Sequence, residues 1–339
     1  MGELGTEEVL ERAALPSDSG DNILRPQRMA DFVGQRKVVD NLALFIKAAK
    51  ARGETMDHVL FSGMPGLGKT TLAHLIADEL GVSMHAASGP MLEKPGDLVG
   101  ILTRLEPGAV LFIDEIHRLP RAAEEFLYSA MEDYYLDVVL EPGVQSRSVR
   151  LTLQKFTLVG ATTREGLLTA PFRARFGVLE RLDPYPECEL AEIVLRSAVR
   201  LGVGIDEAAC DLVAARARGT PRIANRILRR LRDVAEVKGR GRVSVAVAEA
   251  GLEMLGIDGY GLTEMDRRIL RCIADHDGAA GLKTVAVAVG EEEDTIEDTY
   301  EPHLIRQGLL RKTPRGRVIT ERGLEAAGLH VSGRVQQAG

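Results

Sequence analysis

The chain has 339 residues, 45% hydrophobic and 27% charged, which is ordinary for a globular protein of two or three domains. Its 43 basic and 50 acidic residues leave a formal charge of −7, so any surface for nucleic acid has to be local. Three scattered cysteines, no signal-peptide pattern and no apolar run of about 18 residues predict a reduced cytoplasmic protein without a cysteine metal site or a membrane span.

The first half of the chain predicts a mobile arm followed by an α/β domain. Residues 1–20 are polar and lack periodicity. From 21 to 183, apolar strands alternate with amphipathic helices, which predicts a parallel sheet covered by helices. Two alternating runs within 137–153 flank a Pro-Gly turn and predict a β-hairpin. Three short runs predict buried parallel strands: HVLFSG (58–63), AVLFID (109–114) and FTLVGAT (156–162).

The segment GMPGLGKT (63–70) follows the first of these strands and precedes a helical run, as a phosphate-binding loop does. Lys69 would reach the β- and γ-phosphates of a nucleotide, and the Thr70 hydroxyl would ligate Mg²⁺. A glycine-rich loop that arose by chance is the alternative, and the flanking strand and helix argue against it. The glycines that let backbone N–H groups turn toward a phosphate are Gly63, Gly66 and Gly68.

The second and third strands end in residues suited to hydrolysis. Asp114 would hold the magnesium and Glu115 would contact the attacking water, or else Glu115 is an ordinary acid at a helix N-terminus. Thr163 would hydrogen-bond the γ-phosphate or the water, or else it caps the next turn. We expect His117 to be packed or on the surface rather than a ligand.

Two later segments present arginines without an obvious partner. PFRARFG (171–177) contains Arg173 and Arg175, for which solvated surface charge is the ordinary explanation. GTPRIANR (219–226) starts a helix with Arg222 in its first turn, where a cation opposes the helix dipole. This placement suggests that Arg222 serves an anion outside the helix.

The second half of the chain predicts two smaller domains. The prolines of 183–187 mark a linker, and residues 184–255 repeat apolar residues at helical spacing. GIDGYG (256–261) marks another linker, after which three short helices and two strands predict a winged helix over 256–339. The basic turn of the wing would bind DNA phosphates without reading sequence, or else it is simply solvated; its residues are Lys312, Arg315 and Arg317.

In this order the segments resemble the AAA+ ATPases and, more closely, the RuvB family of Holliday junction branch migration motors. The likeness covers about residues 21–325. It is carried by LRPQRMADFVGQ (24–35), GMPGLGKTTLA (63–73), LFIDEIHRL (111–119), MEDYYLD (131–137), FTLVGATTREGLL (156–168), PFRARFG (171–177), GTPRIANR (219–226) and EDTIEDTYEPHLIRQGLLRKTPRGR (293–317).

The resemblance implies a DNA-dependent ATP hydrolase of the helicase type that uses ATP and Mg²⁺. It would comprise a large AAA+ ATPase domain (21–183), a small helical AAA+ lid (184–255) and a winged-helix head (256–339). Arg175 would be an arginine finger inserted into the ATP site of the neighbouring subunit, and Arg173 stays open. Thr163 would be sensor 1 and Arg222 sensor 2. Further nucleotide contacts are implied for Leu24, Arg25, Thr71, Glu132, Asp133, Tyr134 and Tyr185.

The resemblance also implies a homohexameric ring that acts on duplex DNA and Holliday junctions. A RuvA-type junction-binding protein would dock on the 137–153 hairpin, and a RuvC-type resolvase would act indirectly. The chain departs from the family at Glu293, an acid in place of a common arginine, and at Lys312, which replaces the first arginine of the basic turn. Two alternatives stay open: an ATP-switched duplex-binding initiator or regulator, and a clamp-loader-like ATPase. Glu115 and the wing favour the motor.

Overall fold

The computed structural model of the protein describes residues 22–139, 148–314 and 316–329. The predicted N-terminal arm, the Pro-Gly turn of the hairpin and Arg315 lie outside these residues. The described residues form two compact units. One comprises the described residues up to Gly63 together with those between Leu67 and Asp183, and the other comprises the short loop Met64–Gly66 together with the described residues from Pro184 onward. Within the described residues, no helix has both the length and the apolar character that crossing a membrane requires.

The first unit is built on a five-stranded sheet in which every adjacent pair of strands is parallel. The three central strands are the three that the sequence predicts, and the parallel α/β class is confirmed. The two edge strands escape prediction because they bury only part of their residues and lack a continuous apolar run. In spatial order the strands are β2 (Met84–Ser88), β3 (Val110–Asp114), β6 (Thr157–Thr162), β1 (Val59–Ser62) and β7 (Val178–Arg181).

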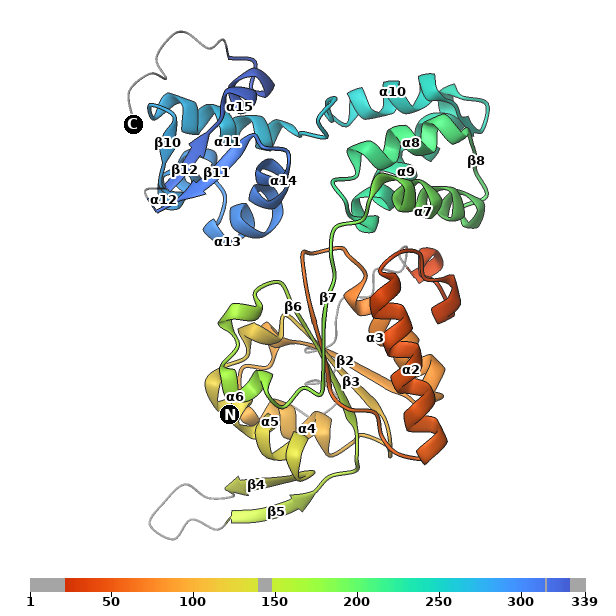
Figure 1. Ribbon diagram of the computed structural model, residues 1–339, viewed down its shortest axis with the longest axis vertical. Helices are drawn as coiled ribbons and strands as arrows, with labels where there is room; N and C mark the ends of the chain where they lie inside the picture. The colour runs from red at the N-terminus through yellow and green to blue at the C-terminus, as the bar shows by residue number, and fades with distance from the viewer. Residues whose placement is uncertain (1–21, 140–147, 315, 330–339) are drawn as a thin grey trace, which may run out of the picture. The chain divides into compact units, whose positions relative to one another are not determined.

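Helices cover both faces of this sheet, and the predicted hairpin is present (Figure 1). On one side lie α2 (Arg36–Arg52) and α3 (Lys69–Leu80), and on the other α4 (Pro95–Leu102), α5 (Arg121–Glu132) and α6 (Ala170–Arg173). The hairpin pairs β4 (Tyr135–Val139) with β5 (Ser148–Thr152). The 3₁₀ turns are η1 (Asn22–Leu24), η2 (Met29–Asp31), η3 (Gly89–Met91), η4 (Ile116–Arg118) and η5 (Glu165–Leu167).

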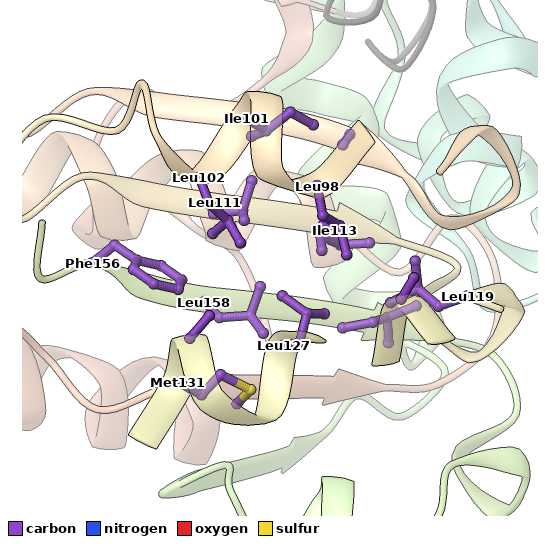
Figure 2. Packing of buried hydrophobic residues seen from close by; sticks show 14 of the residues in the cluster. Leu98, Ile101, Leu102, Leu111, Ile113, Leu119, Leu127, Met131, Phe156 and Leu158 are labelled. Atoms are coloured by element: carbon purple, nitrogen blue, oxygen red, sulfur yellow. The ribbon is translucent and has the colours of Figure 1, made fainter. Parts of the chain in front are cut away.

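A buried apolar cluster joins α4 and α5 to the sheet (Figure 2). Leu111 and Ile113 of β3 and Leu158 of β6 pack against Leu98 of α4 and Leu127 of α5, all fully buried. Burying one such side chain stabilises the fold by about 1.5–3 kcal/mol. The cluster therefore holds β3 and β6 in place, and with them the polar residues at their ends.

The second unit begins with a helical domain. Four helices pack together in it, in agreement with the helical spacing of residues 184–255: α7 (Glu187–Arg200), α8 (Glu207–Arg216), α9 (Pro221–Lys238) and α10 (Val245–Met254). Two short strands, β8 (Gly204–Ile205) and β9 (Arg242–Val243), pair in parallel between them.

The rest of the second unit is a winged helix, as predicted. Its sheet has the order β10 (Ala279–Ala280), β12 (Gly316–Ile319) and β11 (Leu310–Thr313), and β10 is too short for the sequence pattern to reveal. The third predicted helix is interrupted by a π-helical turn just before Pro302, which cannot donate a helical hydrogen bond. The helical elements are α11 (Glu264–Asp275), α12 (Leu282–Val289), α13 (Glu293–Thr295), η6 (Ile296–Tyr300), α14 (Glu301–Arg306) and α15 (Glu321–Ala326).

A buried histidine connects three elements of the first unit. His58, directly before β1, accepts a hydrogen bond at Nδ1 from the Leu158 N–H of β6 (2.8 Å), and its Nε2 lies 3.1 Å from the Met131 carbonyl oxygen of α5. This arrangement requires the neutral ring with its proton on Nε2. Burial lowers the pKa of His58 below its usual value.

We expect His58 to make stability depend on pH. Its folded pKa is depressed, so the unfolded chain binds the proton more readily, and stability is lost as the pH falls below about 6.5. Urea unfolding of wild type should lose more free energy between about pH 7.5 and about pH 5.5 than that of His58→Gln, which does not titrate. Equal losses in the two proteins would show that His58 is not protonated on unfolding.

Candidate active site

A glycine-rich loop joins β1 to α3 at the carboxyl edge of the sheet. Gly63, Gly66 and Gly68 have φ angles of 139°, 80° and 102°, which residues with side chains rarely adopt. A Cβ on Gly63 would lie 2.5 Å from the carbonyl oxygen of Leu182, so only glycine fits there. Lys69 begins α3 and donates from Nζ to the Gly63 carbonyl oxygen at 2.7 Å. Glycines and lysine thus meet at a helix N-terminus, a position that favours an anion.

The predicted carboxylates and hydroxyls lie at the same edge. β6 lies between β1 and β3, and the carboxyl ends of adjacent parallel strands meet at one edge of a sheet. Asp114 ends β3 and accepts the N–H of Glu115 at 3.0 Å, while Thr163 directly follows β6. The half-buried hydroxyls in the first turn of α3 belong to Thr70 and Thr71. This edge therefore gathers the residues that phosphate, a magnesium ion and an attacking water would each need.

His117 connects the predicted catalytic glutamate to β6. Glu115 has a left-handed backbone (φ 49°), and its Oε2 lies 3.5 Å from Nε2 of His117. Nδ1 of the same ring lies 2.9 Å from Oγ1 of Thr162, which also accepts the Arg164 N–H. His117 is packed, in agreement with one of the two predicted placements. Its link between β3 and β6 could not be read from spacing, because the contact depends on the two strands being neighbours.

Arg173 and Arg175 have acidic partners in their own chain that were not apparent from the sequence. A guanidinium nitrogen of Arg175 lies 3.2 Å from a carboxylate oxygen of Glu132, and Nη1 donates to the Pro171 carbonyl oxygen at 2.8 Å. The guanidinium also stacks on the ring of Tyr128, 4.3 Å from its centroid. Arg173 lies 3.9 Å from Glu165. These acids come from α5 and η5, and folding rather than sequence proximity brings them near.

Arg175 lies at the opposite edge of the sheet from the glycine-rich loop. It comes just before β7, whose Val178 pairs with Val59 at the amino end of β1. The loop follows the carboxyl end of β1, and four strand residues span about 13 Å. The end of α5 is at the amino edge too, because the Met131 carbonyl contacts His58. The residues predicted to line a nucleotide site and found at this amino edge with Arg175 are Glu132, Asp133 and Tyr134.

In the second unit, Arg222 packs directly on the glycine-rich loop. It occupies the first turn of α9, where its N–H lies 3.4 Å from the Gly66 carbonyl oxygen. A Cβ on Gly66 would lie 2.9 Å from the Cβ of Arg222, so glycine permits this approach. Tyr185 is buried and donates its N–H to the Gly219 carbonyl oxygen at 2.9 Å, in the segment that leads to Arg222.

The predicted N-terminal contact residues belong to the first unit. Leu24 is buried at the end of η1. The pKa of His74, on α3, is lowered first by burial and then by the positive charge of Arg25. Arg25 therefore lies near α3, the helix that follows the glycine-rich loop.

The wing differs from the prediction at Arg317. Side chains alternate along β12, and Arg317 shares the buried face with Ile319, so it points into the domain. Its Nε donates to Glu301 at 2.5 Å and Nη2 to Glu297 at 2.7 Å. Arg317 is thus committed to an internal ion pair and is not positioned for a phosphate. Lys312 remains half-exposed, although it also lies 2.7 Å from Glu297.

Three family models match the chain in succession: the Holliday junction DNA helicase RuvB P-loop domain over residues 24–182, the RuvB AAA lid domain over 185–258 and the RuvB C-terminal winged helix domain over 259–328. The Holliday junction branch migration complex subunit RuvB of Chlorobium luteolum is 56% identical over 303 residues, 89% of this chain and 88% of that protein. The subunit of the same name from Chlorobaculum tepidum is 58% identical over 299 residues, 88% of this chain and 87% of that protein. The solved structure of the Thermotoga maritima RuvB Holliday junction branch migration motor matches with a TM-score of 0.83 and 47% identity, over 91% of this chain and 99% of that one.

We expect a substitution at Glu115 to separate ATP binding from ATP turnover. Glu115→Gln should bind ATP like wild type, because Lys69, Thr70 and Asp114 remain. Its hydrolysis should fall by about 10²–10⁴-fold, since the amide cannot take a proton from water. Glu125→Gln, an exposed acid on α5, is the matched control and should keep wild-type turnover. Turnover of Glu115→Gln within about threefold of wild type would remove Glu115 from this role.

Proposed function

The chain belongs to the RuvB family, and from this premise we propose that it is an ATP-hydrolysing motor that drives branch migration of Holliday junctions in homologous recombination and DNA repair. The observation that carries the mechanism is the division of the sheet into two edges. One edge gathers residues suited to ATP, and the opposite edge carries Arg175. A chain arranged in this way needs a neighbour to complete each site.

The carboxyl edge fits ATP with a magnesium ion. The approach of Arg222 to Gly66 leaves no room for a Cβ, and Lys69 lies at the N-terminus of α3 with its charge over the loop. Thr70 and Asp114 supply the hard oxygen ligands that Mg²⁺ prefers. When bound, this ion would neutralise charge on the phosphates.

Hydrolysis would depend on how this chain positions water. Glu115 would accept a proton from the water that attacks the γ-phosphate in line. His117 would hold the Glu115 carboxylate toward β6, because its ring is fixed on the other side by Thr162. Thr163, at the end of the same strand, would hydrogen-bond the γ-phosphate or the water. Arg222 would sense the nucleotide through its contact with the loop.

The neighbouring subunit would supply the remaining charge. Arg175 precedes β7 at the amino edge, so we propose that it enters the ATP site of the next subunit together with Glu132, Asp133 and Tyr134. Repeating this contact around a closed circle would give a ring. We propose that the ring is a homohexamer, as the family resemblance implies. Leu24, Arg25, Thr71 and Tyr185 would complete the nucleotide contacts of the chain's own site.

DNA would be held by its backbone. We propose that Lys312 and Arg315 in the wing bind duplex phosphates without reading sequence. The hairpin of β4 and β5 is the proposed docking element for a RuvA-type junction-binding protein, with a RuvC-type resolvase acting indirectly. A bidentate pair of Arg150 with Asp137 holds its two strands in register.

Mixing of subunits tests whether Arg175 acts in trans. Arg175→Ala should still bind ATP, but its hydrolysis should fall by about 10³–10⁵-fold. Lys69→Ala cannot use its own site yet can lend its arginine, so mixing the two variants should restore part of the ATPase and branch migration rates. If mixed rings form but never exceed the sum of the separate variants, the trans role is wrong. Arg173→Ala, close by and paired with Glu165, is the control that should retain most activity.

We expect each basic residue of the wing that contacts a phosphate to add to the salt dependence of duplex binding. Neutralising Lys312 and Arg315 should weaken duplex binding equally on all sequences and lower the log–log salt slope by about 0.9 for each lost phosphate contact. Arg317→Gln should instead lower the melting temperature, because Glu301 stays buried without its partner. An unchanged slope in the first variant would show that the wing points away from DNA.

A further inference from the structure

One arginine in a loop of the lid makes direct hydrogen bonds to the winged helix. Arg218 lies between α8 and α9, and its guanidinium makes two hydrogen bonds to the Asp266 carboxylate of α11, at 3.2 and 2.5 Å. Nε donates to the Gly261 carbonyl oxygen at 2.8 Å. The Arg218 side chain is 8% exposed and that of Asp266 is fully buried. All of these contacts lie within the second unit.

A second arginine binds the same loop from α14. Arg306 donates from Nη2 to the carbonyl oxygen of Arg218 at 2.9 Å. A Cβ on Gly219 would lie 2.8 Å from Nη1 of Arg306, so the glycine allows the guanidinium to cross the loop. The loop is therefore held by both its side chain and its backbone.

The backbone of Arg218 has an unfavourable conformation that the contacts of its side chain must stabilise. Its φ of 54° is in the left-handed region, where glycine is the favoured residue. A long, charged residue in this conformation is disfavoured locally and needs support from its surroundings. Asp266 gives that support and is itself fixed, because it also caps α11 through the N–H of Thr263 at 2.7 Å.

The same loop leads within four residues to the nucleotide-sensing arginine. Gly219 accepts the Tyr185 N–H at its carbonyl oxygen, Thr220 is the N-cap of α9, and Arg222 packs on Gly66 of the phosphate loop. A short path of direct contacts thus runs from the phosphate loop to α11 of the winged helix. The rest of the connection, GIDGYG at 256–261, contains three glycines and would by itself allow the domains to swivel.

We propose that Arg218 and Asp266 are positioning residues that couple the nucleotide state at Arg222 to the DNA-binding winged helix. This inference rests on the proposed motor function. A bidentate pair fixes orientation as well as distance, so the winged helix follows the sensing loop when Arg222 moves. Coupling between two sites is reciprocal, so DNA bound to the winged helix acts back on Arg222.

A double substitution should remove the Arg218–Asp266 pair with little effect on the fold of the second unit. Arg218→Gly suits the left-handed backbone, and Asp266→Asn keeps an oxygen to cap α11 without leaving a buried charge. The double variant should keep its melting temperature and its ATPase rate without DNA. Stimulation of kcat by duplex DNA should fall at least about fivefold with the KM for ATP unchanged. The difference in duplex affinity between the ADP state and a non-hydrolysable ATP analogue should shrink by a similar factor.

Two further variants make the result specific. Arg218→Lys keeps a cation beside Asp266 but loses the bidentate geometry, and it should lose DNA stimulation to an intermediate degree even if the double variant does not fold. Arg267 and Asp258 form a similar pair, at 2.9 Å, between the same helix and the linker without touching the sensing loop. Arg267→Gln with Asp258→Asn should therefore keep wild-type stimulation.

The outcomes separate the coupling from the motor. Wild type without DNA-stimulated hydrolysis would overturn the proposed function and the coupling together. Wild-type stimulation retained by both the double variant and Arg218→Lys would overturn the coupling alone. An equal loss in the Arg267 control would also overturn it, because any pair near the linker would then suffice.

Discussion

The parallel sheet is the constraint on which the rest of the structure depends. In a parallel sheet every strand presents its carboxyl end to one edge and its amino end to the other. Gly63, Asp114 and Thr163 therefore meet although about 50 residues separate each from the next. Arg175 precedes a strand of the same sheet and is placed at the opposite edge. A single geometric rule thus both gathers these residues and places Arg175 at the opposite edge.

The second unit adds a different kind of constraint, made by buried charge. Arg218 with Asp266 and Arg317 with Glu301 are ion pairs largely removed from water. Such pairs contribute little net stability, because desolvation offsets their attraction, but they tolerate only one geometry. In this unit they determine how the winged helix is attached and how its wing is held.

Patterns local in the chain could be predicted from the sequence, and contacts between distant segments could not. The three central strands, the glycine-rich loop and the acids Asp114 and Glu115 carry their signal within a few residues. The partner of Arg175 is Glu132, 43 positions away, and that of Arg218 is Asp266, 48 positions away, so neither pair leaves a local trace. The prediction for Arg317 was wrong because a basic turn resembles a phosphate site. The alternation of buried and exposed side chains along β12 places Arg317 on the buried face.

The contacts of Arg175 have a consequence for the entropy of assembly. An arginine on a mobile surface keeps many rotamers, and fixing one costs up to about 2 kcal/mol. Here the stacked ring of Tyr128, the Glu132 carboxylate and the Pro171 carbonyl restrict the side chain within a single folded subunit. Most of that ordering accompanies the folding of the chain and would not recur on assembly with a second subunit. If Arg175 enters a neighbouring ATP site as proposed, the interface would receive a preorganised cation, and association would not have to immobilise it.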